Sequence, residues 1–166
     1  MEVWTARHLW RTLDRGKREE IALSLWEDER LSRAERAAAL APWLTARGMR
    51  EAFLNKLPRT RRAGLLAEGG VPEETASQLL TSYHLTRKRP LLARFLDLLE
   101  IKHEEGIIAE EEELQPPEKE KVSQAASRLE EEFPGDDVAL YLRTLVVADP
   151  VTWEAVGEVV GAPKSD

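Results

Sequence analysis

Prolines and glycines divide this chain into short helical segments, and this division is the strongest constraint on its fold. Proline suits the start of a helix, where its missing N–H has no intrahelical partner, and disrupts a helix interior. Five prolines stand where a segment of helical hydrophobic periodicity begins, namely Pro58, Pro72, Pro90, Pro117 and Pro150. Four glycines follow such segments, as left-handed helix ends require, namely Gly16, Gly48, Gly106 and Gly135. The pattern predicts an all-α protein of short helices.

About ten helical segments can be delimited in this way. They cover residues 2–14, 17–28, 33–47, 49–56, 58–67, 72–84, 89–104, 117–133, 136–148 and 150–160. Ser32 and Glu35 match a capping box at the start of the third segment, and Asp149 can cap the last one ahead of Pro150. The segment 89–104 is apolar on nearly all sides, which predicts a central helix surrounded by others.

The connections between these segments predict a multi-helix bundle of antiparallel helical hairpins. Helix starts recur at roughly 14 to 18 residues after Pro58, which also fits a solenoid-like stack, although no repeated signature accompanies the spacing. The one long connection, 107–116, contains four consecutive glutamates and predicts an extended acidic linker. We therefore expect an N-terminal helical unit at 1–106 and a small C-terminal helical unit at 117–166, either separate or packed as one domain.

Charge is sorted along the chain. Residues 1–94 contain 18 Lys and Arg against 12 Asp and Glu, whereas residues 95–166 contain 6 against 19, within a total formal charge of −7. Such a gradient can bring two parts of one molecule together or prepare each part for a different partner. It favours association over chemistry as the role of the protein.

Composition excludes several classes of protein. The chain has no cysteine, which excludes disulfides, thiolate metal sites and a cysteine nucleophile. Hydrophobic residues make up 42%, which is too apolar for a disordered chain. The N-terminal residues mix tryptophan with arginine, which does not suit a signal peptide, and no apolar run has the length of a membrane span. A cytoplasmic protein with no membrane partner is expected.

Motifs for catalysis are weak. Glu100 and His103 form a Glu-x-x-His pair, which di-iron bundles use twice, but no second copy exists, and we expect no metal and no cofactor. The three histidines belong to no recognisable nucleophile pattern. An enzyme would need a concave pocket that collects His84 or His103 with carboxylates of perturbed pKa.

Two basic clusters are the better candidates for binding. One surrounds the helix start at Pro58 and the other precedes Pro90, and helix starts already favour anions. The candidate residues are Arg59, Arg61, Arg62, Arg87, Lys88 and Arg89. They predict either a phosphate or nucleic-acid site or contacts with the chain's own C-terminal carboxylates. The acidic pI of about 5.2 favours the second interpretation.

Tryptophan supplies half of the aromatic side chains and is concentrated near the N-terminus. Trp4 and Trp10 lie six residues apart, hence on different sides of one helix, so one of them is a candidate interface anchor.

The sequence predicts a noncatalytic protein-interaction or scaffold module whose partner is another protein or a second copy. A nucleic-acid or phosphate-binding domain masked by its own acidic region is the first alternative, and an enzyme is the second.

Overall fold

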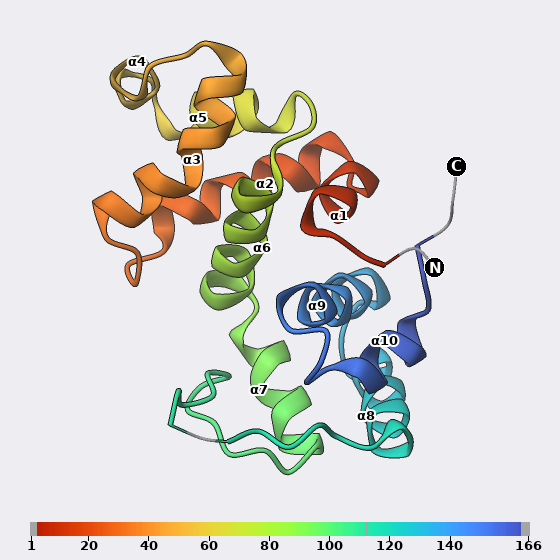
Figure 1. The fold of residues 1–166 in the computed structure, drawn as a ribbon. Coiled ribbons are helices and arrows are strands. Elements are labelled where there is room, and N and C mark those ends of the chain that lie inside the picture. The colour runs from red at the N-terminus through yellow and green to blue at the C-terminus, as the bar shows by residue number, and fades with distance from the viewer. Residues whose placement is uncertain (1–2, 112, 164–166) are drawn as a thin grey trace. The chain divides into compact units, whose positions relative to one another are not determined.

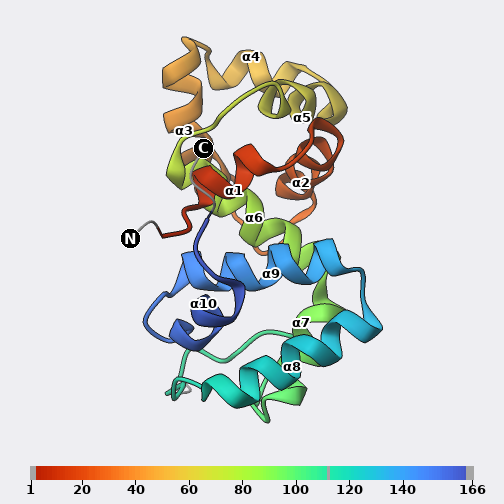
Figure 2. The same cartoon turned by 90° about the vertical axis from the view of Figure 1, so that its right-hand side faces the viewer.

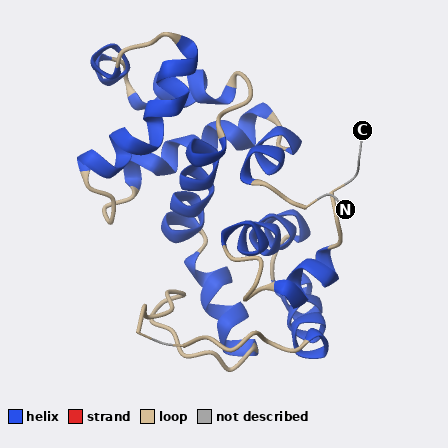
Figure 3. Ribbon diagram, viewed as in Figure 1, coloured by secondary structure: helices blue, strands red, loops and turns tan. Residues whose placement is uncertain are grey.

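The computed structural model describes residues 3–111 and 113–163, and within them the chain is an all-helical bundle (Figures 1 and 3). The helices are α1 (Ala6–Thr12), α2 (Arg15–Glu27), α3 (Arg33–Arg47), α4 (Glu51–Lys56), α5 (Arg59–Ala67), α6 (Glu73–Arg87), α7 (Arg89–Leu98), α8 (Lys119–Glu132), α9 (Gly135–Ala148) and α10 (Glu154–Val160). The predicted fold class is confirmed. None of the helices in this described part is long and apolar enough to cross a lipid bilayer.

The helices group into two compact units. The N-terminal unit is Thr5–Arg87, and the C-terminal unit is Lys88–Asp166 together with Met1–Trp4. The boundary thus falls between α6 and α7, and the segment 107–116, expected as a linker, belongs to the C-terminal unit. The N-terminal unit holds 15 Lys and Arg against 11 Asp and Glu, a formal charge of +4, and the C-terminal unit holds 9 against 20, a charge of −11.

In the N-terminal unit, α2 packs on both α5 and α6, and α6 also contacts α1 and α3. A solenoid would confine such contacts to neighbouring hairpins, so the solenoid-like alternative does not describe this unit. Its core contains side chains that are almost completely buried, namely Trp10, Ile21, Trp43, Leu54, Leu66 and Tyr83. These side chains come from every helix of the unit, which explains why its helices fold together.

Polar caps start several helices of the N-terminal unit. The Oγ of Ser32 accepts a hydrogen bond from the backbone N–H of Glu35 at 3.0 Å, as the sequence predicts.

Gly48 ends α3 in the left-handed conformation, with φ 63°. Gly16 and Gly135 instead lie inside the first turns of α2 and α9, so the prediction that they end helices is wrong. Neither of these two glycines has a positive φ, so neither forms a left-handed helix end.

Glu73, at the start of α6, binds the backbone at the start of α1. Its two carboxylate oxygens accept hydrogen bonds from the backbone N–H groups of Ala6, at 2.8 Å, and Arg7, at 2.9 Å. Replacing Glu73 by alanine should leave both donors unpaired and lower the free energy of unfolding by about 1–2 kcal/mol. Urea denaturation measures the loss. Glu74→Ala, at the next exposed position, is the control, and equal losses in the two variants would contradict this role for Glu73.

In the C-terminal unit, α8 contacts α7, α9 and α10 (Figure 2). Phe95 of α7 lies at its centre, edge-on to Tyr141 with ring centroids 5.6 Å apart, and 6.1 Å from the ring of Trp153. Burial raises the pKa of the Tyr141 phenol well above its ordinary value. The four buried side chains Leu91, Leu92, Phe95 and Leu96 lie on one side of α7. The helix therefore buries one face rather than all of its surface, since Asp97 is exposed.

The helix expected over 89–104 ends early, at Leu98. Glu100 adopts φ 59°, and the N–H of Ile101 donates to the carbonyl of Leu96, which closes the helix end without a glycine. Gly106 has φ 87°, but it lies in the return loop, where an added Cβ would come 2.8 Å from the Cβ of Leu92. This close approach, rather than a helix end, explains the glycine.

The last helix begins later than expected, at Glu154 rather than near Pro150. Asp149 does act as a cap, but of the turn that precedes the helix, because its Oδ1 accepts from the N–H of Thr152 at 3.1 Å. Hydrogen bonds with Thr152 hold the pKa of this carboxyl below its ordinary value.

Candidate functional site: a basic pocket in the N-terminal unit

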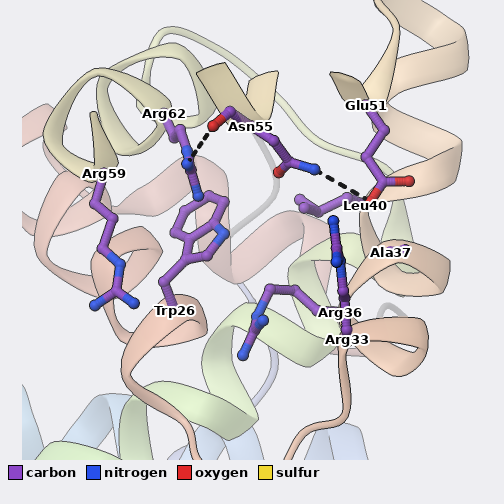
Figure 4. A pocket seen from close by; sticks show the side chains of 9 residues that line it. All are labelled: Trp26, Arg33, Arg36, Ala37, Leu40, Glu51, Asn55, Arg59 and Arg62. Atoms are coloured by element: carbon purple, nitrogen blue, oxygen red, sulfur yellow. Dashed lines mark hydrogen bonds between the residues drawn. The ribbon is translucent and has the colours of Figure 1, made fainter. Parts of the chain in front are cut away.

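A pocket of about 320 Å³ opens among α2, α3, α4 and α5 of the N-terminal unit (Figure 4). Its lining contains four arginines and a single carboxylate. The lining residues are Trp26, Arg33, Arg36, Ala37, Leu40, Glu51, Asn55, Arg59 and Arg62. In the view of Figure 4, the indole of Trp26 lies between Arg59 on one side and Arg33 and Arg36 on the other. The pocket is therefore cationic with an aromatic wall.

The arginines come as two pairs with the same spacing. Arg33 and Arg36 lie in the first turn of α3, and Arg59 and Arg62 lie in the first turn of α5. Residues three apart share one face of a helix, so each helix start presents two guanidinium groups to the same pocket.

The inner member of each pair is anchored to backbone carbonyls. The Nε of Arg36 donates to the carbonyl of Leu25 at 3.1 Å, near the end of α2. Arg62 donates from Nε to the carbonyl of Leu57 at 2.8 Å and from Nη2 to that of Asn55 at 2.7 Å. These hydrogen bonds fix the two side chains without neutralising their charge.

Arg62 also covers the indole of Trp26. Its guanidinium carbon lies 5.5 Å from the ring centroid, within the range of a cation–π contact. Trp26 is only 7% exposed, so its ring serves as a wall of the pocket and is not an open aromatic surface.

The outer members, Arg33 and Arg59, are exposed. Among the residues that the structure describes, neither forms a hydrogen bond or an ion pair through its side chain. Glu51, the single carboxylate of the lining, accepts a hydrogen bond from the amide of Asn55 at 3.4 Å. The two outer guanidinium groups are thus available to a ligand.

The environment of the pocket disfavours the charged form of Arg62. Burial lowers the pKa of Arg62, and the positive charges of Arg59 and Arg36 lower it further. Neighbouring guanidinium groups therefore repel one another here, and an anion would relieve that repulsion.

No family model, curated protein or solved structure matches this chain.

Of the six basic residues singled out in the sequence, Arg59 and Arg62 line the pocket. Arg61 is exposed and lies outside the lining. Arg87 pairs with Glu27, at 3.1 Å from Nε to Oε2. The hydrogen bond and charge of Arg87, with the charge of Arg59, lower the pKa of the Glu27 carboxyl, although burial opposes them. Glu27 is thus engaged beside the pocket.

Lys88 and Arg89 belong to the C-terminal unit and pair with its carboxylates. The Nζ of Lys88 lies 3.0 Å from Oδ2 of Asp137, and Nη1 of Arg89 lies 3.1 Å from Oε2 of Glu105. The sequence-based interpretation that basic residues contact the chain's own C-terminal carboxylates therefore holds for Lys88 and Arg89. The six candidate residues are thus divided between the two units, because the unit boundary falls between Arg87 and Lys88.

Trp4 and Trp10, the two candidate interface anchors, both form contacts within the chain. Trp10 is completely buried, and its Nε1 donates to the carbonyl of Gly69 at 3.0 Å. Trp4 is half-buried, donates from Nε1 to the carbonyl of Gly161 at 2.8 Å, and lies under the guanidinium of Arg143 at 4.6 Å. Both rings therefore already have contacts within the chain.

His84 and His103 each have contacts within their own unit. Both nitrogens of His103 are engaged, Nε2 with Asp97 at 2.6 Å and Nδ1 with the N–H of Gly106 at 2.9 Å. His84 is buried, with Nδ1 2.8 Å from the carbonyl of Leu80. Neither the basic pocket nor a second cavity, of about 450 Å³ around Ile101 and Pro117, is lined by histidine. No metal-binding group of three His, Asp or Glu occurs in residues 3–111 and 113–163.

Sequence reasoning missed Arg33 and Arg36. A signal was present, because both follow the Ser32 cap within one turn, where acidic residues are favoured and basic ones are not. The same spacing at Arg59 and Arg62 repeats that exception. Only the packing of α3 and α5 about Trp26 shows that the two pairs share a pocket.

Proposed function

We propose that this protein is a noncatalytic interaction module whose basic pocket binds an anionic group of a partner. The observation that carries the proposal is the presence of four guanidinium groups against one carboxylate around Trp26. The two exposed ones, Arg33 and Arg59, form no ion pair among the described residues, although the charge of Arg59 acts on the nearby carboxylate Glu27.

The positions of these arginines support a binding role because they oppose the stability of the protein. A positive side chain in the first turn of a helix interacts unfavourably with the helix dipole, at a cost of roughly 0.3–1 kcal/mol each. Two like charges three residues apart add a further small repulsion. Local rules broken in this way, with no ion pair to Arg33 or Arg59 to offset the cost, are expected mainly at functional sites. An anion bound in the pocket supplies the missing compensation.

An acidic protein segment suits the pocket better than a nucleic acid. Base stacking needs an open aromatic face, and the indole of Trp26 is covered by Arg62. Nucleic-acid binders also present a basic stripe along the backbone path, whereas this chain carries a formal charge of −7. The partner we propose is therefore another protein, or a second copy of this chain, that offers exposed carboxylates or another anionic group.

The test uses a fluorescently labelled hexaglutamate peptide and measures its anisotropy on titration with the full chain at low salt. The double variant Arg33→Gln/Arg59→Gln should bind at least about tenfold more weakly than the native chain, because two charge-assisted contacts are lost. Arg61→Gln is the matched control, since Arg61 lies in α5 but outside the pocket, and it should bind as the native chain does.

Two results would overturn the proposal. One is the absence of saturable binding by the native chain to any anionic probe. The other is an equal loss of affinity in the double variant and in Arg61→Gln, which would indicate nonspecific charge attraction. A labelled DNA duplex run in parallel tests the alternative, and tighter binding of the duplex than of the peptide through Arg33 and Arg59 would favour nucleic acid.

A further inference from the structure

We infer that the group recognised by the basic pocket is a phosphoryl group in its doubly charged form, carried as a phosphate monoester. The inference rests on the proposed function and specifies the chemistry of its ligand. It follows from the number of charges in the pocket, from their placement on two helices, and from the size of the cavity.

The charge count favours a dianion. Four arginines and Glu51 give the lining a formal charge of +3, and Glu27, which lies beside Arg59, is already engaged by Arg87. A single carboxylate would neutralise one of these charges, whereas a phosphate monoester carries about −1.5 to −2 at neutral pH. The doubly charged ligand thus leaves less repulsion among the guanidinium groups.

The placement of the arginines favours a tetrahedral acceptor. One carboxylate is planar and is best matched by one guanidinium fork. Here the donors come from two different helix starts, with Arg33 on α3 and Arg59 on α5 on opposite sides of Trp26 in Figure 4. A phosphoryl group presents three acceptor oxygens in different directions, so it can accept from both sides at once.

The cavity favours a small phosphate ester over a larger polyanion. Its volume of about 320 Å³ is at the lower end of the range for ligand pockets. Leu40 and Ala37 add an apolar wall on the α3 side, which suits the short carbon chain of an ester. A phosphorylated side chain and a free small phosphate ester share this chemistry.

The experiment measures binding of O-phosphoserine and of a short peptide containing phosphoserine to the full chain by calorimetry, at constant ionic strength. Both should bind at least about tenfold more tightly than glutamate and a peptide with glutamate at the same position. Tighter binding of the phosphopeptide than of free phosphoserine indicates a phosphorylated protein as the source, and equal binding indicates a free ester. Arg33→Gln/Arg59→Gln should lose this preference, whereas Arg61→Gln should retain it.

The dependence on pH provides a second readout. The second pKa of a phosphate monoester is about 6, so phosphoserine should bind several-fold more tightly at about pH 7.5 than at about pH 5.5. The charged groups that line the pocket are four arginines and Glu51, with Glu27 and Arg87 beside it, and none of them is a histidine, the side-chain type that ordinarily changes charge in that interval. The affinity for the glutamate peptide should therefore stay constant over the same interval.

The outcomes separate this inference from the proposed function. If the glutamate and phosphoserine peptides bind equally through Arg33 and Arg59, the phosphoryl inference is wrong and the anion-binding function stands. If neither peptide binds, both are wrong. If phosphoserine binds equally well to the double variant, its site lies elsewhere and the assignment of the pocket fails.

Discussion

Replacing Trp10 by alanine is expected to lower the free energy of unfolding of the N-terminal unit by about 3–5 kcal/mol. Trp10 is completely buried in α1, and its Nε1 donates to the carbonyl of Gly69 at 3.0 Å. Truncation removes the contacts of the largest side chain type and leaves that carbonyl without its donor. Urea denaturation followed by far-ultraviolet circular dichroism measures the change.

Trp10→Phe separates the two contributions. It keeps most of the buried volume but removes the donor to the carbonyl of Gly69. We therefore expect Trp10→Phe to lower the free energy of unfolding by about 1–3 kcal/mol, which is less than the loss in Trp10→Ala. A loss below about 1 kcal/mol in the alanine variant would show that α1 does not contribute to the core as described.

Replacing Phe95 by alanine should destabilise the C-terminal unit to a similar extent, by about 3–5 kcal/mol. Phe95 is completely buried, and its ring contacts Tyr141 and Trp153, which come from two other parts of that unit. Its loss therefore opens a cavity where α7, α9 and the start of α10 meet. Near-ultraviolet circular dichroism, which reports the packing of aromatic rings, measures the change in stability during denaturation.

Phe53→Ala is the matched control for Phe95→Ala. Phe53 is 54% exposed on α4, so its truncation should change stability by no more than about 0.5 kcal/mol. Similar losses in the two variants would contradict the assignment of Phe95 as the centre of the C-terminal core.

Helix positions were predictable because local chemistry sets them. Ser32 and Pro58 stand at the N-caps of α3 and α5, as the capping preferences of serine and the backbone of proline require. The errors also have local causes. Glu100 closes α7 in a left-handed conformation that is rare for a residue with a side chain, so the sequence pattern overestimates that helix.

The division into units was not predictable from the acidic segment alone. The glutamates at 110–113 suggest a linker by their repulsion, but the buried face of α7 packs with α8, and this contact assigns residues 88–106 to the C-terminal unit. Burial of Phe95 and its neighbours outweighs the charge pattern, since hydrophobic contact is the dominant favourable term in folding.

The basic pocket could be predicted only in part. Arg59 and Arg62 stand out because they cluster in sequence, whereas Arg33 and Arg36 are separated from them by more than twenty residues. Which helix starts face each other depends on how α3 and α5 pack about Trp26. That packing is a long-range property which the sequence pattern does not specify.

The most direct test of the basic pocket is nuclear magnetic resonance of the arginine Nε–H and tryptophan indole N–H groups during titration with phosphoserine. We predict saturable shifts concentrated at Arg33, Arg59 and Arg62 and at the indole of Trp26, with Arg61 and Arg15 unchanged. Shifts of similar size at all exposed arginines, or no shift at the pocket residues, would contradict the account.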